Sequence, residues 1–382
     1  MKILHLSHES LPDWRVEKSA ITASKKGHVV FFGGKYPSEY GNKTFQKIYP
    51  IDWTAKARYG IPFYWNSVKK QVEKVIREVK PDIVHAHNIF SAKMISEFDL
   101  PFVYDDHEYW SSQARLLNEI VGNLYDINRK KPLQSAKKLA LKIRRLLINN
   151  HIIRLYNKWE KELVSYHPII TVSDRLAHEL SLKSGHDKKI FVVPNYPMRS
   201  EVSEVGKPLP HTTISCIYAG GDGLNKVKYP NRNIDELPEL FEKNAIGSLT
   251  ITGWKGLSSK KVTYKGYLKR ADMYAEMSRH SIGLIPWKRH WSHTFVNPNK
   301  TYEYVHAGLF IMCTDSFTVI TETLKHNCAI FQDYTALVSQ LEYFKENPEE
   351  LYRKRISSYE FAQANLFWEK NESKIFRAYQ SS

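Results

Sequence analysis

Short apolar segments alternate with longer segments of helical spacing along the first half of the chain. The strand-like runs are residues 3–5, 28–32, 82–87 and 101–104. Segments of helical periodicity separate them at residues 15–26, at residues 68–79 and from Ser91 onward. Such an alternation predicts βαβ units, in which parallel strands are joined by crossover helices. Strands at 169–172 and 191–193, with a helix opened by Ser173 or Asp174 between them, continue the pattern.

A second series of the same kind follows a polar stretch at residues 197–211, which contains Pro197, Pro208 and Pro210 and has no apolar periodicity. Its strands are predicted at 213–218, 248–252, 262–265, 281–285 and 310–313, and helices at 234–244, up to residue 279 and at 302–307. We therefore predict an α/β protein of two doubly wound, Rossmann-like domains. We expect the domains to span 1–200 and 201–360, followed by a terminal helix at 361–382.

A long helical tract at residues 128–166 interrupts the first series. Basic and apolar side chains are interspersed in it: Lys130, Lys131, Lys137, Lys138, Lys142, Arg144, Arg145 and Arg154 with Leu139, Leu141, Ile143, Leu146, Leu147, Ile152 and Ile153. This pattern predicts a basic amphipathic helix or helix pair. Two interpretations stay open: a surface helix with a solvated charged face, and a helix whose residues 130–154 bind an anionic membrane surface.

Composition narrows the class of protein. The chain has 382 residues, of which 42% are hydrophobic and 25% charged, values typical of globular proteins. The net charge of +16 favours an anionic partner, which could be nucleic acid, an anionic lipid surface or a phosphorylated substrate. The three cysteines form no Cys-x-x-Cys pair, so neither a disulfide framework nor a zinc site is indicated. The first residues lack the features of a secretory signal, and we expect a cytoplasmic location.

Candidate chemistry follows the strands, because ligands of open α/β sheets bind at the carboxyl ends of the strands. After the strand ending at Tyr104, residues 105–110 read Asp-Asp-His-Glu-Tyr-Trp, and we predict an active-site turn that exposes His107 and three carboxylates. The alternative for Asp105 or Asp106 is that either caps the next helix. A hard divalent cation would need further oxygen ligands, and the sequence has no second acidic cluster, so we expect no metal.

A glycine-rich turn follows the first strand of the second series, at residues 219–223. The glycines Gly220 and Gly221 would let the backbone approach a diphosphate, and the cations after them could neutralise it. Those cations are Lys226, Lys228 and Arg232. The alternative is that the glycines serve the turn conformation only.

The most specific segment is residues 297–310, Asn-Pro-Asn-Lys-Thr-Tyr-Glu-Tyr-Val-His-Ala-Gly-Leu-Phe. It resembles the Pro-Asn-Lys-x-x-Glu-Tyr-x-x-x-Gly signature of retaining glycosyltransferases similar to glycosyltransferase family 4. Other segments that resemble this family occur in the expected order: residues 13–18, 27–28, 82–87, 103–108, 170–173, 193–197, 252–253 and 265–267. The resemblance therefore covers nearly the whole chain.

The resemblance implies the GT-B architecture, in which two Rossmann-like domains face each other across a cleft and the C-terminal helix, here containing residues 367–370, crosses back to the first domain. It implies that Glu303 binds the ribose of a nucleotide-sugar donor. Lys300, Arg232 and Lys226 would neutralise the diphosphate, His107 would lie beside the donor sugar, and Tyr267 and Leu268 would hold the base. No metal and no cofactor are implied.

Two positions depart from the family pattern. Many relatives have a glutamate eight residues before the one matched by Glu303, where this chain has Phe295. Contacts to the donor sugar would then come from residues 296–299: Val296, Asn297, Pro298 and Asn299. Relatives also place an arginine where this chain has Gly221, and Lys226 or Lys228 would substitute for it.

We therefore expect a retaining, metal-independent transferase that moves a sugar to a glycan or lipid-linked acceptor, as in polysaccharide biosynthesis, in the cytoplasm or on the cytoplasmic membrane face. Two alternatives remain. A nucleotide-sugar epimerase or hydrolase of the same fold would share the donor pocket. A basic nucleic-acid-binding protein would explain the charge, but it would leave the segment from Lys300 to Glu303 without a purpose.

Overall fold

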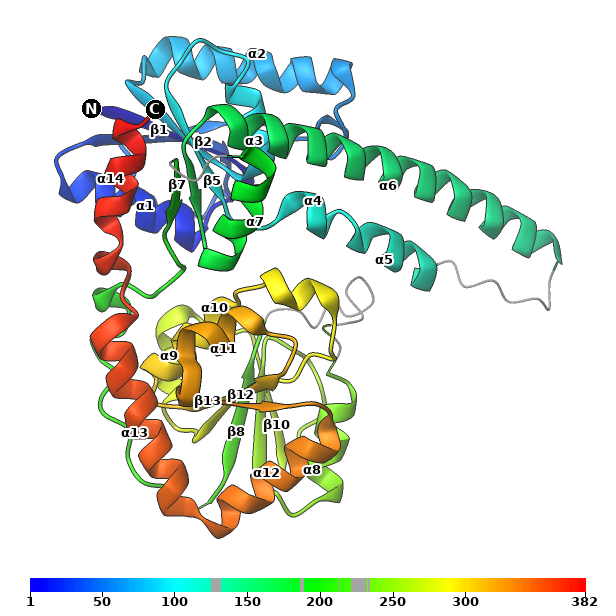
Figure 1. Cartoon of the computed structure of the whole chain (residues 1–382), viewed down its shortest axis with the longest axis vertical. Helices are drawn as coiled ribbons and strands as arrows, with labels where there is room; N and C mark the ends of the chain where they lie inside the picture. Colours follow the sequence, from blue (N-terminus) through cyan, green and yellow to red (C-terminus); the bar gives the residue numbers. More distant parts are fainter. Residues whose placement is uncertain (125–131, 186–188, 212, 221–231, 233) are drawn as a thin grey trace. The chain divides into compact units, whose positions relative to one another are not determined.

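The computed structural model describes residues 1–124, 132–185, 189–211, 213–220, 232 and 234–382, which form two compact units (Figure 1). Unit 1 comprises Met1–Pro194 together with Asn371–Ser382, and unit 2 comprises Asn195–Lys370. Each unit is built on its own parallel sheet, so the predicted fold class of two Rossmann-like α/β domains is confirmed.

Unit 1 contains a seven-stranded parallel sheet among its described residues, in the order β3-β2-β1-β4-β5-β6-β7. The strands are β1 (Lys2–Ser10), β2 (Val29–Lys35), β3 (Lys47–Pro50), β4 (Ile83–His87), β5 (Phe102–Asp106), β6 (Ile169–Thr171) and β7 (Ile190–Val192). The strand order reverses between β1 and β4, and a doubly wound sheet binds its ligand at the carboxyl ends of the strands at such a point.

Helices flank this sheet and connect its strands (Figure 1). They are α1 (Trp14–Lys25), α2 (Pro62–Val79), α3 (Asn88–Ile95), α4 (Trp110–Gln113), α5 (Leu116–Leu124), α6 (Pro132–Tyr166), α7 (Asp174–Ser184) and α14 (Glu372–Gln380), with the short 3-10 helix η1 (Ala57–Tyr59). Asp13 caps α1 by accepting hydrogen bonds from the backbone N–H groups of Arg15 and Val16. Ser173 caps α7 in the same way, as the sequence predicted.

The C-terminal helix α14 belongs to unit 1, although the chain reaches it from unit 2. It packs against α1 and β7 (Figure 1). The Glu372 carboxylate accepts a hydrogen bond from the Thr22 hydroxyl. The Tyr379 hydroxyl contacts Nδ1 of His85 at 2.8 Å. The prediction that the C-terminal helix returns to the first domain is therefore confirmed.

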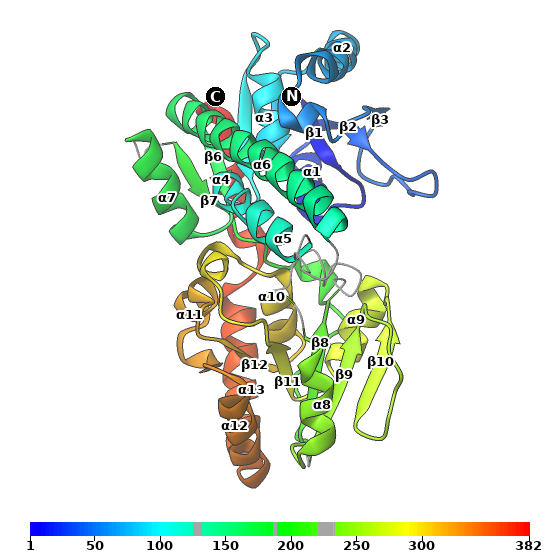
Figure 2. The same ribbon diagram turned by 90° about the vertical axis from the view of Figure 1, so that its right-hand side faces the viewer.

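Residues 132–166 of the basic tract form one long helix, α6, whose described neighbours include α4 and α5 (Figure 2). Lys130 and Lys131 lie outside the described residues. The second half of α6 is anchored by buried Ile152, Tyr156 and Trp159, whereas several apolar side chains of its first half are exposed. None of the described helices combines the length and the apolar character needed to cross a bilayer.

Unit 2 contains a six-stranded parallel sheet among its described residues, in the order β10-β9-β8-β11-β12-β13. The strands are β8 (Ser215–Ala219), β9 (Ser248–Thr252), β10 (Val262–Gly266), β11 (Ile282–Ile285), β12 (Phe310–Thr314) and β13 (Cys328–Phe331). The helices are α8 (Glu236–Lys243), α9 (Arg270–Met277), α10 (Asn299–His306), α11 (Thr318–Leu324), α12 (Tyr334–Glu346) and α13 (Pro348–Asn365), with the 3-10 helices η2 (Arg199–Glu201), η5 (Trp291–Phe295), η6 (Lys325–Asn327) and η7 (Trp368–Lys370).

A close contact between β11 and Tyr304 sets the position of α10 on this sheet. A Cβ atom at Gly283 would lie 2.4 Å from the Tyr304 ring, so only glycine leaves room for that ring. The buried Tyr304 hydroxyl accepts a 2.7 Å hydrogen bond from the Ala219 backbone N–H at the end of β8, and it donates to the Leu284 carbonyl at 3.3 Å. Because α10 carries Lys300 and Glu303, these contacts fix both side chains relative to the carboxyl end of β8.

Candidate active site

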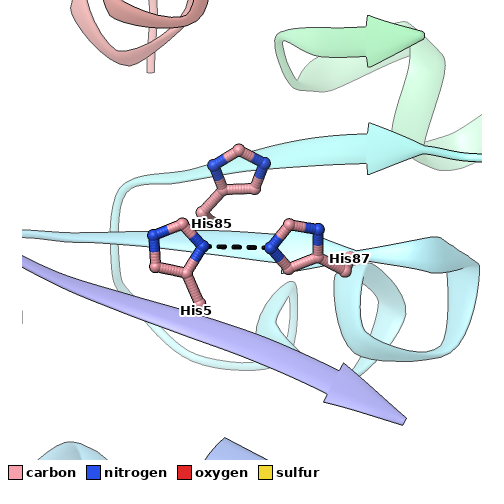
Figure 3. Close-up of side chains that lie close together, drawn as sticks. All are labelled: His5, His85 and His87. Atoms are coloured by element: carbon pink, nitrogen blue, oxygen red, sulfur yellow. Dashed lines mark hydrogen bonds between the residues drawn. The ribbon is translucent and has the colours of Figure 1, made fainter. Parts of the chain in front are cut away.

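Strand register gathers a histidine cluster on one face of the unit 1 sheet. His5 of β1 is paired with His85 of β4, and His87 of β4 is paired with Asp105 of β5. Side chains two residues apart in a strand share a face, so His5, His85, His87 and Asp105 lie together. Figure 3 shows His5 and His87 edge to edge, with the His85 ring stacked beside them. His107, two residues after Asp105, contacts His87.

Asp105 is the charged centre of this cluster. Its carboxylate accepts hydrogen bonds from Nε and Nη2 of Arg15 at 2.9 and 2.6 Å, and its Oδ2 lies 3.1 Å from Nε2 of His85. Burial alone would raise the pKa of Asp105, but the Arg15 guanidinium and the nearby His107 hold that pKa well below its usual range. Asp105 is therefore an ionised carboxylate whose charge is matched by Arg15.

The Asp-Asp pair corrects one expectation from the sequence. Asp105 and Asp106 are the last residues of β5 and are fully buried, so neither carboxylate is exposed in a turn. Neither caps a helix, because α4 begins at Trp110. Successive residues point to opposite faces, and Asp106 accepts a hydrogen bond from the Tyr104 hydroxyl instead. His107 is partly buried and Glu108 is exposed, so these two residues form the accessible part of the segment.

Two sets of side chains among the described residues have a spacing that a metal ion could use: His5, His85 and His87, and His87, Asp105 and His107. In the first set the His85 ring stacks on the His87 ring at 4.4 Å with an interplanar angle of 11°. Imidazole lone pairs lie in the ring plane, so stacked rings do not direct them at one ion. In the second set Arg15 already neutralises Asp105. Both arrangements fit a hydrogen-bonded network better than a metal centre.

Unit 2 brings together Lys300, Arg232 and Gly220. Nζ of Lys300 lies 4.2 Å from the centroid of the Tyr218 ring and 5.1 Å from that of Trp287. The Arg232 guanidinium lies 4.8 Å from the same Trp287 ring. A Cβ atom at Gly220 would lie 3.0 Å from Nζ of Lys300. Two cations therefore lie around the Trp287 indole ring at the carboxyl end of β8. The adjacent residue Gly220 has no side chain.

Glu303 lies one turn after Lys300 on α10 and forms a buried ion pair. Its Oε1 accepts a 2.8 Å hydrogen bond from Nη1 of Arg270, whose Nε donates to Glu201 at 2.6 Å. Burial disfavours the charged guanidinium, but Glu303, Tyr274 and Glu201 outweigh this effect and raise the pKa of Arg270. The predicted ribose ligand is therefore held in place by an arginine at the start of α9.

The other predicted donor contacts lie in loops of unit 2. Tyr267 is 86% exposed and, with Leu268, follows the carboxyl end of β10. Residues 296–299 connect η5 to α10, and Oδ1 of Asn297 accepts a 2.7 Å hydrogen bond from the Tyr302 hydroxyl. Phe295, at the position of the family's first glutamate, ends η5. Gly221, Lys226 and Lys228 lie outside the described residues.

Arg15, His5, His85, His87, Arg270 and Glu201 were not among the predicted site residues. The sequence did contain a pattern that points to the histidines. His85 and His87 alternate with apolar residues in β4, which is buried along its whole length. Polar side chains two residues apart on the core face of such a strand need partners there. For Arg15 and Arg270 there was no such signal, because their partners lie 90 and 33 residues away in the chain.

Residues 23–196 match the model of a family described as Glycosyltransferase Family 4. No curated protein matches the chain.

Solved structures, three of which follow, resemble the chain over nearly its full length. Sucrose-phosphate synthase from Thermosynechococcus elongatus has a TM-score of 0.67 and 12% identity, with 99% of this chain and 98% of that chain covered. A glycosyltransferase from Rickettsia africae has a TM-score of 0.64 and 12% identity, with 99% and 97% covered. HepE from Anabaena in complex with UDP has a TM-score of 0.62 and 11% identity, with 100% of both chains covered.

At these identities the structural similarity establishes the fold, which is the two-domain fold that these proteins share. The family match over the first half of the chain adds the enzyme class. Together they support a glycosyltransferase enzyme of the GT-B type, similar to Glycosyltransferase Family 4.

Proposed function

We propose that this enzyme transfers a sugar from a nucleoside diphosphate sugar to an acceptor hydroxyl, with retention of configuration at the reacting carbon and without a metal ion. One observation carries the proposal: Lys300 and Arg232 meet around Trp287 beside Gly220, and Glu303 follows on the next turn of α10. This group offers two cations to a diphosphate and one carboxylate to a sugar hydroxyl. HepE, which shares the fold, binds UDP, and this supports a nucleotide donor.

The setting of Lys300 suits a leaving diphosphate. Its ammonium is buried against aromatic faces, where interactions with charge are stronger than in water. As the bond between the sugar and the diphosphate breaks, negative charge grows on the phosphate oxygens, and Lys300 and Arg232 would stabilise it. Fixed cations can thereby perform the work that a divalent metal performs in other phosphate-leaving reactions.

The ion pair with Arg270 suits the proposed role of Glu303. Ribose recognition needs an ionised carboxylate in a fixed orientation, because the accepting oxygen must face hydroxyls at fixed positions. Arg270 holds Oε1 of Glu303, and no described side chain hydrogen-bonds to Oε2. Oε2 is therefore the atom that we assign to the ribose hydroxyls.

Retention follows most simply from attack on the face that the diphosphate leaves, with the acceptor proton passing to a phosphate oxygen. No protein nucleophile is then needed, and positioning together with charge stabilisation supplies the acceleration.

The first half of α6 supports an acceptor at an anionic lipid surface. Leu139, Ile143 and Leu147 recur every four residues and are 46%, 50% and 66% exposed, so they form one apolar stripe on the helix. At 100° per residue, Lys142 and Arg144 flank this stripe on its two sides. An apolar stripe between cations matches the boundary between acyl chains and anionic headgroups.

Titration calorimetry in a metal-free buffer tests the donor pocket, with UDP, GDP and ADP and their common sugar conjugates as ligands. We expect micromolar binding of one nucleotide, lost in Glu303→Gln. Glu201→Gln is the matched control, because it alters the same Arg270 pair without touching the proposed ribose ligand, and it should retain binding. If no nucleotide binds while nucleic acid binds tightly and in a salt-dependent manner, the function is nucleic-acid binding by the basic surface instead.

Product analysis by NMR tests the reaction. The linkage formed should keep the anomeric configuration of the donor, and transfer should persist in EDTA. A free sugar, or an epimerised nucleotide sugar formed without any acceptor, would instead support a hydrolase or an epimerase.

Sedimentation with vesicles tests the lipid surface. The protein should bind vesicles that contain phosphatidylserine, with binding weakened by salt, and it should not bind phosphatidylcholine alone. The variant Ile143→Ser/Leu147→Ser should lose most of this binding. Equal sedimentation of variant and wild type would remove the stripe from the proposal and leave a soluble acceptor.

A further inference from the structure

The carboxyl end of β1 carries a partly exposed carboxylate, Glu9, next to a buried imidazole, His8. The register of β1 against β2 shifts between Leu6 and Ser10, so the strand is irregular where these two residues stand. Irregularities of this kind change the direction of side chains, whereas a regular strand points successive side chains to opposite faces. Nε2 of His8 lies 2.9 Å from Oε1 of Glu9. The carboxylate is therefore held by its neighbour in the chain.

Aromatic rings fix the imidazole that holds Glu9. His8 is only 5% exposed. The centroid of its ring lies 4.5 Å from that of Phe90, 5.6 Å from that of Trp110 and 6.4 Å from that of Trp53, with the rings edge to face. Phe90 belongs to α3, which follows β4, and Trp110 opens α4, which follows β5. A ring enclosed in this way has little freedom to rotate, so its Nε2 fixes the position of Oε1.

The charges of this group leave one oxygen of Glu9 open to a ligand. Burial lowers the pKa of His8, which keeps the ring neutral near pH 7. The hydrogen bond from His8, together with the nearby Arg58, lowers the pKa of Glu9 to about 2. An ionised carboxylate can only accept, so the ring proton is on Nε2 of His8. The part of the chain that the structure describes forms no hydrogen bond to Oε2 of Glu9, whose side chain is 49% exposed.

Trp110 places a partly exposed aromatic ring beside the same imidazole. Its Nε1 donates a 3.2 Å hydrogen bond to Oδ1 of Asn88. Asn88 is buried and has a φ of 65°, in the left-handed region that residues other than glycine seldom adopt. Strained backbone of this kind persists where the surrounding structure determines it, and it is common at ligand sites. The indole ring is therefore fixed in orientation, as the carboxylate is.

A fixed carboxylate and a fixed aromatic ring on either side of one imidazole match the chemistry of a neutral sugar. Hydroxyl groups of a sugar donate hydrogen bonds to a carboxylate oxygen, and its C–H groups pack against an aromatic ring. A cationic ligand fits less well, because Arg58 already compensates the charge of Glu9. An anionic ligand would be repelled by Glu9.

We propose that Glu9 and Trp110 form a sugar-binding subsite of unit 1, in which Oε2 of Glu9 accepts a hydrogen bond from a hydroxyl group of the acceptor and His8 is a positioning residue. The inference rests on the proposed function only for the identification of this sugar as the acceptor. The subsite consists of contacts within unit 1, so it can be tested without a donor and without transfer.

Saturation-transfer difference NMR tests the subsite, with millimolar methyl glycosides of glucose, galactose, mannose, N-acetylglucosamine and rhamnose as probes and no nucleotide present. We expect at least one glycoside to bind. Glu9→Gln should raise its Kd by at least about tenfold, because a hydrogen bond to a charged acceptor is lost. Glu73→Gln, which removes the same charge from a 44% exposed side chain of α2, is the matched control and should bind as the wild type does. If none of the glycosides binds, or if Glu9→Gln binds as tightly as the wild type, the proposal is wrong.

Two substitutions at His8 separate positioning from packing. His8→Gln retains an N–H donor near the position of Nε2, whereas His8→Leu does not. His8→Leu should raise the Kd for the glycoside about threefold or more, because the Glu9 side chain must then be ordered on binding, and His8→Gln should restore most of the affinity. Equal Kd values for the two variants would contradict the positioning role. If neither variant folds, Glu9→Gln decides, because that change is at a partly exposed side chain.

Nucleotide binding, measured by titration calorimetry, separates this inference from the proposed function. Glu9→Gln should bind nucleotide as the wild type does. A protein that binds nucleotide but no glycoside would contradict the subsite alone, and one that binds a glycoside through Glu9 but no nucleotide would contradict the proposed function alone.

Discussion

Gly220 directly follows the last residue of β8, and the space where its side chain would lie is already occupied. A Cβ atom there would be 3.0 Å from both Nζ of Lys300 and the Tyr218 hydroxyl. Since a lysine ammonium can move at small cost, Gly220→Ala should fold normally but displace the cation. We expect nucleotide affinity to fall by about tenfold, equivalent to about 1.4 kcal/mol, measured by titration calorimetry.

Gly206→Ala is the control for this change. Gly206 lies in a loop of unit 2, and a Cβ atom there would meet no atom within 4 Å. This variant should bind nucleotide as the wild type does. Equal affinities for the two variants would mean that the position of the Lys300 ammonium does not matter for binding.

Arg270 is the residue on which the arrangement of Glu303 depends. The side chains of Arg270, Glu303 and Glu201 are only 17%, 9% and 10% exposed, so loss of the guanidinium leaves two carboxylates poorly solvated. Arg270→Met should lower the free energy of unfolding by roughly 3 kcal/mol, measured by urea denaturation.

A surface ion pair provides the comparison for Arg270. Lys288 and Glu236 are paired with side chains 57% and 61% exposed, and Lys288→Met should change stability by less than about 1 kcal/mol. Similar losses in Arg270→Met and Lys288→Met would show that the buried pair has no special role.

At the residue scale the sequence was informative where a motif is local. Gly220, Lys300 and Glu303 stand in short segments whose spacing can be read directly, although their proposed roles remain to be tested. Arg15 and Arg270 could not be found in this way, because an arginine that neutralises a distant buried carboxylate resembles any surface arginine. For the same reason Asp105 was placed in an exposed turn, since nothing nearby in the sequence shows that Arg15 permits its burial.

At the scale of elements, the histidines on the face shared by β1 and β4 make the free energy of unfolding depend on pH. Burial lowers the pKa of His5, His85 and His87 below the usual 6.5, and it does so strongly for His5 and His87. Below pH 6.5 the unfolded chain therefore binds more protons than the folded chain. The contribution of the neutral histidines to the free energy of unfolding is complete above pH 6.5 and is lost as the pH falls. A histidine that is protonated in the unfolded chain and neutral in the folded chain contributes a limiting slope of about 1.4 kcal/mol per pH unit.

His5→Leu isolates one of these slopes. Other buried histidines contribute to both variant and wild type, so urea denaturation between pH 6.5 and 5.5 should show a loss of stability that is smaller in the variant by about 1 kcal/mol. His178→Gln, which changes an exposed histidine of α7, should keep the wild-type slope. An unchanged slope in His5→Leu would show that His5 is not buried in its neutral form.

Most strands and helices could be predicted from the sequence, and some could not. Most apolar strands between helical segments were found close to their true ends, and residues 248–252 match β9 without error. The first strand was predicted at residues 3–5, but β1 continues to Ser10. Of the four edge strands, β7 and β10 were predicted, whereas β3 and β13 were missed. β3 and β13 have four residues each and only one fully buried residue each, so their apolar pattern is weak. The helices α11, α12 and α13 follow the last predicted strand and were not predicted separately.

At the scale of the whole molecule, the two units divide the proposed chemistry. Gly220, Arg232, Lys300 and Glu303 all belong to unit 2, together with Arg270 and Glu201, whereas His107 belongs to unit 1. The core of unit 2 is formed by its own residues. Nucleotide binding should therefore be separable from sugar transfer.

The test is a fragment of residues 195–370, which corresponds to unit 2. It should unfold cooperatively and bind the same nucleotide as the full chain, with a Kd within about threefold, because a difference of that size is below 1 kcal/mol. It should transfer no sugar. If residues 195–370 fold but bind no nucleotide, unit 1 must supply essential donor contacts, and the assignment of the donor pocket to Lys300, Arg232 and Glu303 would be incomplete.

A fragment of residues 1–194 would lack the Tyr379 contact to His85, so its stability should rise when residues 371–382 are joined to it by a flexible linker.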